Sequence, residues 1–189
     1  MHLPDDIDGA LKHGKSLLED SLEHLQKELG KLRTGKASPD MVSDLLVSYY
    51  GAPTPLSQVS NVSTSDARTL IIQPWEKSLL PAIEKSIFEA NMGLTPQNDG
   101  EIVRITIPPL TEERRKELVK KAKALGEEAK VSQRNIRRAI IDVIKKEVKN
   151  GYPEDAGKRE EEKADKLAHQ YHDRTDQLIH AKEKDIMTI

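Results

Sequence analysis

Three long stretches of this chain combine many charged residues with narrow, regularly spaced apolar seams, and this pattern constrains the fold more than any other feature. In the first stretch, residues 5–32, leucines recur at steps of three, four and seven residues, namely Leu11, Leu18, Leu22, Leu25, Leu29 and Leu32. Such heptad spacing predicts a helix that packs along one edge against partner helices. Charged residues make up 33% of the chain against about 25% in ordinary globular proteins, which indicates that the other sides of these helices face solvent.

Two further helices are predicted after Pro108-Pro109. One begins at Thr111, a suitable N-cap, and continues to about residue 148; the other occupies about 154–187, after the turn formed by residues 150–153. The seam of the former consists of Leu118, Ala122, Leu125, Ala129, Ile136, Ile140 and Val143, and that of the latter of Ala164, Leu167, Tyr171, Leu178 and Ala181. Because a narrow seam cannot be buried within its own helix, we expect the three helices to form an antiparallel three-helix bundle.

Between the first and second helices the periodicity changes from helical to strand-like. Residues 46–50, 59–63, 69–73 and 102–107 predict mostly antiparallel strands, residues 79–90 a short helix, residues 51–55 a turn and residues 91–101 a loop. The prediction is therefore an α+β fold with two domains. The bundle comprises residues 1–33 and 107–189, and a small β-rich α/β-sandwich domain comprising residues 34–106 is inserted between them.

The distribution of charge is uneven. Residues 111–150 hold 13 basic and 7 acidic side chains, a net charge of +6. The three other segments, residues 1–32, 33–110 and 151–189, each carry a net negative charge. Lysines and arginines recur in this segment at steps of about three and four residues, as Lys116, Lys120, Lys123, Lys130, Arg134, Arg137, Arg138 and Lys145. Such a basic face is typical of polyanion binding, and arginine suits bidentate phosphate contacts. The alternative is a solvated helix face with intrahelical ion pairs, although no acid lies between Lys130 and Arg138.

Several classes of function are disfavoured. There is no cysteine, no apolar run of about 20 residues that could span a membrane, and no phosphate-binding loop or nucleophile motif. His169 and His172 could share a helix face but lack a third metal ligand, which favours surface histidines. Trp75, the one tryptophan, follows a predicted strand and is interpreted as a packing anchor rather than a contact residue. We therefore expect a cytoplasmic binding protein with no cofactor or metal, not an enzyme.

Four longer motifs carry a resemblance to a known family. They are residues 31–39 (KLRTGKASP), 49–56 (YYGAPTPL), 108–118 (PPLTEERRKEL) and 134–138 (RNIRR). In this order they make the chain resemble the bacterial ribosome recycling factors over essentially its whole length. The resemblance implies an L-shaped monomer that binds large-subunit ribosomal RNA after termination, and on which elongation factor G acts with GTP to split the ribosome. The alternative is a helical scaffold or co-chaperone that binds protein partners.

The resemblance also implies roles for individual residues. Arg137 corresponds to the principal RNA-contact arginine of the family. The full set of RNA-binding candidates is Arg134, Arg137, Arg138, Lys130, Lys123, Lys120, Arg114, Arg115, Arg33 and Lys36, and the hinge candidates are Arg33, Thr34, Gly35, Thr106, Ile107, Pro108 and Pro109. Three departures stand out: Lys36 replaces a usual arginine, Ser132-Gln133 replaces a more apolar pair, and Ala139 replaces a common aspartate that could orient a neighbouring arginine.

Overall fold

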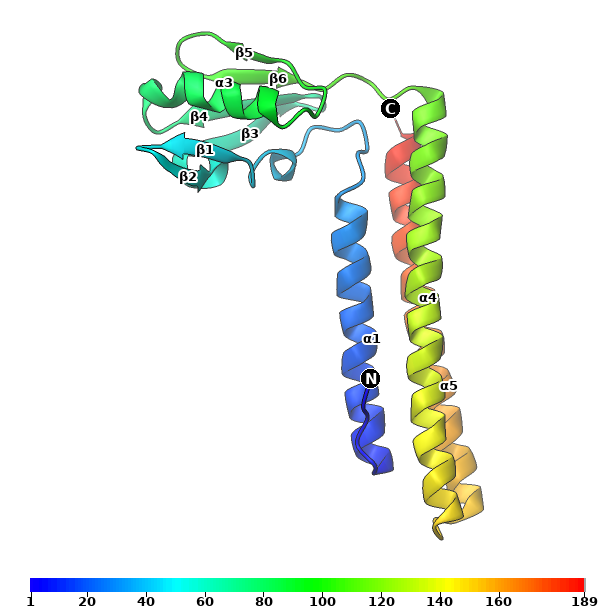
Figure 1. The fold of residues 1–189 in the computed structure, drawn as a ribbon. Helices are drawn as coiled ribbons and strands as arrows, with labels where there is room; N and C mark the ends of the chain where they lie inside the picture. The colour runs from blue at the N-terminus through cyan, green and yellow to red at the C-terminus, as the bar shows by residue number, and fades with distance from the viewer. Residues whose placement is uncertain (189) are drawn as a thin grey trace. The chain divides into compact units, whose positions relative to one another are not determined.

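The computed structural model describes residues 1–188, which separate into two compact units (Figure 1). The first, called the helical unit below, consists of Met1–Leu32 and Glu113–Thr188, and the second, the sheet unit, of Arg33–Glu112. None of the helices formed by these residues is both long and apolar enough to cross a membrane.

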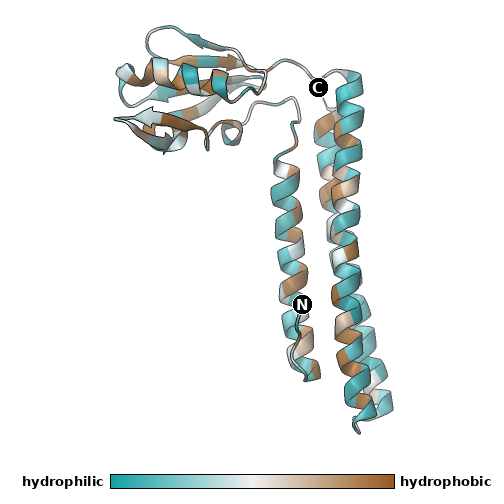
Figure 2. Ribbon diagram, in the orientation of Figure 1, coloured by the Kyte–Doolittle hydropathy of each residue, from teal (hydrophilic) through white to brown (hydrophobic). Residues whose placement is uncertain are grey.

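The helical unit contains three long helices, α1 (Ile7–Gly30), α4 (Glu112–Lys149) and α5 (Glu154–Met187). The chain turns back between α4 and α5, so that these two helices run antiparallel and side by side (Figure 1). Helix α1 begins at the N-cap Asp6, whose carboxylate accepts a hydrogen bond from the backbone N–H of Gly9 at 2.7 Å. Figure 2 shows all three as mostly hydrophilic ribbons crossed by hydrophobic bands. The predicted helices are confirmed, and the bounds of α5 are those expected from the sequence.

The apolar seams differ from the prediction in their details. Leu18, Leu22, Leu25 and Leu29 are buried as expected, whereas Leu11 is only half-buried. Leu11 still packs against the core of the helical unit, where the small residues Ala10 and Gly14 are the buried ones. In α4 and α5 the buried positions also include Gly126, Gln133, Ile144, Gly157, Ala168, Thr175 and Ile186, while Ala181 is exposed, contrary to prediction. The heptad rule fails here because a helix with 3.6 residues per turn drifts away from a strict seven-residue repeat, and because small residues let the helices approach closely.

Gly14 offers a direct test of this close packing. A Cβ at Gly14 would lie 2.9 Å from Cγ1 of the buried Ile140, whereas one at Gly30 would meet no atom within 4 Å. We therefore expect Gly14→Ala to lower the free energy of unfolding by about 1–3 kcal/mol through overpacking. Gly30→Ala, the control at the C-terminal end of the same helix, should leave it unchanged or raise it by up to about 0.5 kcal/mol. Urea denaturation of both variants measures the difference, and equal stabilities would contradict the close contact.

The sheet unit is built from two antiparallel sheets. A two-stranded ribbon joins β1 (Leu46–Tyr49) to β2 (Ala52–Pro55), and a four-stranded sheet has the order β3-β4-β6-β5. Its strands are β3 (Ser60–Asp66), β4 (Thr69–Pro74), β5 (Pro96–Asn98) and β6 (Val103–Thr106), and the helices of the unit are α2 (Leu56–Val59) and α3 (Leu80–Glu89). Two short 3-10 helices, Pro39–Met41 and Lys77–Leu79, complete the unit. The predicted α+β fold is confirmed.

Three predictions for this unit were wrong. Residues 52–55 form strand β2 rather than a turn, and residues 96–98 form strand β5 rather than a loop. Pro53 and Pro55 are tolerated in β2 because that strand pairs only with β1. Trp75 is 68% exposed and is not a packing anchor. Along β4 the buried residues Leu70, Ile72 and Pro74 alternate with more exposed ones, so the next odd-numbered position points outward.

Each unit has its own hydrophobic core. The core of the sheet unit draws only on residues between Ala37 and Ile107, with fully buried side chains from β4, β6 and α3. The core of the helical unit joins Leu3, Ile7 and α1 to residues of α4 and α5. Within residues 1–188, the two cores share no residue.

Candidate nucleic-acid interface

Helix α4 carries most of the basic candidates. Arg134, Arg138, Lys120 and Lys123 are exposed, while Lys130 and Arg137 are half-buried. Positions 130, 134, 137 and 138 follow one another at steps of four, three and one residues, which places their side chains along neighbouring parts of the helix surface. The structure therefore groups the arginine-rich part of α4, residues 134–138, with Lys130 at its N-terminal edge.

Three of these cations are paired with carboxylates of α5. Lys123 Nζ lies 4.0 Å from an oxygen of Glu183, and Lys130 Nζ lies 2.5 Å from an oxygen of Asp176. Arg137 Nε donates a hydrogen bond to Asp165 Oδ1 at 2.6 Å. The three cations are seven residues apart on α4, so they recur on the side that faces α5. The basic surface is thus bordered by a row of acids along its α5 edge.

Sequence reasoning missed these acidic partners. Within α4 the run from Lys130 to Arg138 does lack an acid, although Glu127 lies 4.0 Å from both Lys130 and Arg134. The acids of α5 come close because α4 and α5 form an antiparallel hairpin. Residues about equally far from the turn at 150–153 then face each other, and counting outward from that turn could have found the pairs.

The pKa of His172, on α5, is affected by burial and by the positive charges of this surface. Its pKa is lowered below its usual range by burial first, and further by the positive charges of Arg134 and Lys130. Its Nε2 is buried and has no hydrogen-bond partner among the residues that the structure describes. The neutral imidazole is therefore favoured here, as expected beside a cluster of cations.

The remaining histidines do not form a metal site in the described part of the chain. His169 lies 3.5 Å from the carboxylate of Asp173 on the next turn of α5. No group of three or more His, Cys, Asp or Glu side chains within residues 1–188 is arranged to hold a metal ion.

The other candidates lie elsewhere. Arg114, in the first turns of α4, forms an ion pair with Glu117 at 2.9 Å, and Arg115 is half-buried. Arg33 and Lys36 belong to the sheet unit, where Arg33 Nη1 donates to the backbone oxygen of Met92 at 3.4 Å. Lys36 is exposed. Arg114 and Arg115 lie roughly 30 Å along α4 from residues 134–138, so these two residues are not part of that cluster.

The hinge candidates differ in how firmly the structure holds them. Gly35 has φ +78°, a left-handed conformation that favours glycine. Thr106 is the last residue of β6, and Ile107 is buried in the core of the sheet unit, where its N–H donates to the backbone oxygen of Arg68 at 2.7 Å. Thr106 and Ile107 are thus held firmly by the sheet unit.

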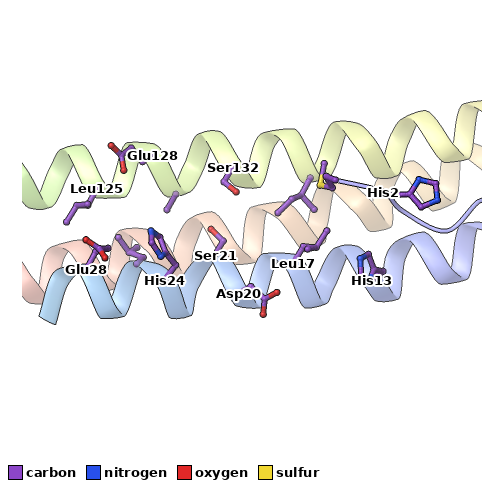
Figure 3. Close-up of a pocket in the computed structure, with 14 residues that line it drawn as sticks. His2, His13, Leu17, Asp20, Ser21, His24, Glu28, Leu125, Glu128 and Ser132 are labelled. Carbon is purple, nitrogen blue, oxygen red and sulfur yellow. The ribbon is translucent and has the colours of Figure 1, made fainter. Parts of the chain in front are cut away.

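A groove of about 480 Å³ runs between α1 and α4, on another part of the helical unit (Figure 3). Side chains such as Ser21, His24 and Ser132 project into the space between the two helices. Its charged lining residues, apart from histidines, are the acids Asp20, Glu28 and Glu128, and the rest is largely apolar. An acidic rim does not suit phosphate, so this groove is not part of the candidate interface.

The chain is similar throughout to one group of known proteins. The family model described as "Ribosome recycling factor" matches residues 25–187. The ribosome-recycling factor of Porphyromonas gingivalis is 48% identical, over 91% of this chain and 93% of that protein. That of Cytophaga hutchinsonii is 46% identical, over 98% of this chain and 100% of that protein.

Solved structures agree with this assignment. The solution structure of a ribosome recycling factor shares 38% identity with a TM-score of 0.77, covering 97% of this chain and 98% of that one. A second structure describes the Thermus thermophilus factor and Escherichia coli elongation factor G bound to the post-termination complex. Its matching chain is 42% identical with a TM-score of 0.65, covering 96% of this chain and 99% of that one. By sequence and by fold, this chain belongs to the ribosome recycling factor family.

Proposed function

We propose that this chain binds the post-termination ribosome on large-subunit ribosomal RNA. With elongation factor G and GTP it then promotes splitting into subunits and release of mRNA and tRNA. The support is its family membership, together with a related structure in which a recycling factor and elongation factor G are bound to the post-termination complex. The chain acts by binding, as a monomer in the cytoplasm, and needs no cofactor of its own.

The RNA-binding surface in this proposal is centred on α4. Arg134, Arg137 and Arg138 supply guanidinium groups, which match phosphate oxygens with two parallel hydrogen bonds. Lys120, Lys123 and Lys130 add positive charge along the same helix, and Arg114, Arg115, Arg33 and Lys36 are secondary candidates. The observation that carries the assignment is the acid-free basic run of α4, whose Arg134 and Arg138 are exposed to solvent.

The two units have separate tasks in this proposal. The helical unit, Met1–Leu32 and Glu113–Thr188, holds the RNA, and the sheet unit, Arg33–Glu112, swings relative to it when elongation factor G acts on the bound chain. Motion between them requires backbone freedom at residues 33–35, whereas Pro108 and Pro109, whose φ angles are fixed, keep the second connection stiff and extended. Because Thr106 and Ile107 are anchored in the sheet unit, that connection begins after Ile107.

Salt dependence tests the RNA-binding assignment. Each phosphate neutralised by a cation releases counterions, so contacts by three arginines should weaken binding roughly ten- to fiftyfold between about 50 and 200 mM salt. Co-sedimentation with isolated large subunits at several salt concentrations measures the slope. Binding that does not change over this range would contradict the assignment and favour the protein-binding scaffold.

A further inference from the structure

The side chain of Arg137 is held by a single contact across the α4–α5 interface. Its Nε donates to Asp165 Oδ1 at 2.6 Å, and this is the one hydrogen bond of the Arg137 side chain within residues 1–188. The side chains of Arg137 and Asp165 are 39% and 53% exposed, so a ligand can reach the pair. The contact therefore fixes the guanidinium at a surface rather than burying it.

The geometry leaves the phosphate-binding end of Arg137 available. A contact through Nε occupies one edge of the guanidinium plane, and Nη1 and Nη2 remain for an acceptor. Arg174 on α5 shows the opposite arrangement, since its Nη1 and Nη2 donate to the two oxygens of Glu19 at 3.0 and 3.2 Å. That bidentate pair uses the atoms that a phosphate would need, whereas the Asp165 contact does not.

No acidic residue of α4 lies close enough to Arg137 in the sequence to hold its side chain. The helix contains no Asp or Glu between Glu128 and Asp142, and Ala139 follows the arginine pair. The carboxylate that holds Arg137 comes instead from the facing helix, 28 residues further along the chain.

We propose that Asp165 is a positioning residue for RNA binding: it holds Arg137 in the orientation in which both Nη groups are free for phosphate. This inference rests on the function proposed above. An arginine that is ordered before binding loses less conformational freedom when it meets its ligand. Asp165 is thus expected to strengthen RNA binding although its own charge repels phosphate.

The pair formed by Lys130 and Asp176 provides the matched control. Asp176 lies on the same helix, pairs with an α4 cation at 2.5 Å and is 62% exposed. A lysine ammonium group is a point charge with no fixed hydrogen-bonding plane to orient. Removing either acid changes the net charge of the protein by one, but only the loss of Asp165 frees a guanidinium.

The test compares large-subunit binding by Asp165→Ala, Asp165→Asn and Asp176→Ala with that by the wild type. We expect Asp165→Ala to weaken binding by about two- to tenfold. Asp165→Asn keeps an oxygen acceptor and should bind at least as tightly as the wild type. Asp176→Ala should not weaken binding. Melting temperatures should stay unchanged in all three, because exposed ion pairs contribute little to folding.

A double-mutant cycle separates the positioning role from other effects. In a protein that already carries Arg137→Ala, the further change Asp165→Ala should not weaken binding, because there is no guanidinium left to orient. If Asp165→Ala binds as tightly as Asp176→Ala, or more tightly than the wild type, Asp165 merely competes with phosphate and the inference is wrong. If Arg137→Ala alone binds like the wild type, the proposed RNA surface itself fails.

Discussion

Replacing Arg137 with alanine is expected to lower the affinity for the large ribosomal subunit by about ten- to a hundredfold. A charge-assisted hydrogen bond lost at an interface costs roughly 1.5–3 kcal/mol, which corresponds to that range. Folding should barely change, because the Arg137–Asp165 pair is exposed to solvent and such pairs contribute about 0–1 kcal/mol to stability.

The measurement is co-sedimentation or equilibrium binding, with thermal unfolding of the same preparation. Arg159→Ala is a suitable control, because it removes one exposed arginine from α5 and therefore changes the net charge equally. Arg137→Lys keeps the charge without the planar fork and should bind with intermediate affinity. Unchanged binding by Arg137→Ala would refute its role, and a lowered melting temperature would show that it serves to hold α4 against α5.

Helical packing was predictable because its signal is local. A seam of apolar residues repeats every three to four positions, and glycine or proline marks where it stops, so the three long helices could be derived from the sequence. The exact members of the seams could not. Gly14, for example, is buried because Ile140 packs against it, and that contact depends on how two helices distant in sequence are aligned.

The candidate interface was predictable to the same extent. The basic residues of α4 stand out because they are close together in the sequence. The α5 acids Asp165, Asp176 and Glu183 do not, since each is surrounded by other charges of the same helix and meets its cation only across the α4–α5 interface. Partners supplied by another element require knowledge of the helix pairing.

The sheet unit shows where local rules mislead. Gly51 and two nearby prolines predict a turn that ends a strand, but the chain reverses at Tyr50 and Gly51 and pairs Ala52 with Tyr49. A proline at an edge position does not remove a backbone N–H that the sheet needs as a hydrogen-bond donor. A strand that contains proline can therefore form there. The position of Trp75 follows from strand alternation in β4, which becomes visible only once the buried face of that strand is known.

Removing the inserted domain is expected to abolish ribosome splitting while leaving RNA binding largely intact. In this variant, residues 36–107 are replaced by a short, flexible Gly/Ser linker. The replacement removes every residue of the sheet-unit core and none of the helical-unit core. The remaining helices still bury their seams against one another, so the variant should fold cooperatively and still present Arg134, Arg137 and Arg138.

Three measurements on one preparation test this prediction: thermal unfolding, large-subunit binding, and subunit splitting with elongation factor G and GTP. We expect cooperative unfolding, binding within a few-fold of the wild type, and no splitting. An unfolded variant would show that the helices depend on the insert for stability. Splitting at the normal rate would refute the mechanical role of the inserted domain.

A single substitution tests the same mechanical role without removing the inserted domain. Gly35 and Gly93 both lie in the sheet unit with positive φ, +78° and +70°, and alanine is strained at either position. The two Gly→Ala variants should therefore destabilise the sheet unit by similar amounts. Gly35, however, lies in the first connection between the units, where we place backbone freedom. We expect Gly35→Ala to bind ribosomes normally but to split them several-fold more slowly, and Gly93→Ala to do both normally. Equal splitting rates for the two variants would show that residues 33–35 do not act as a hinge.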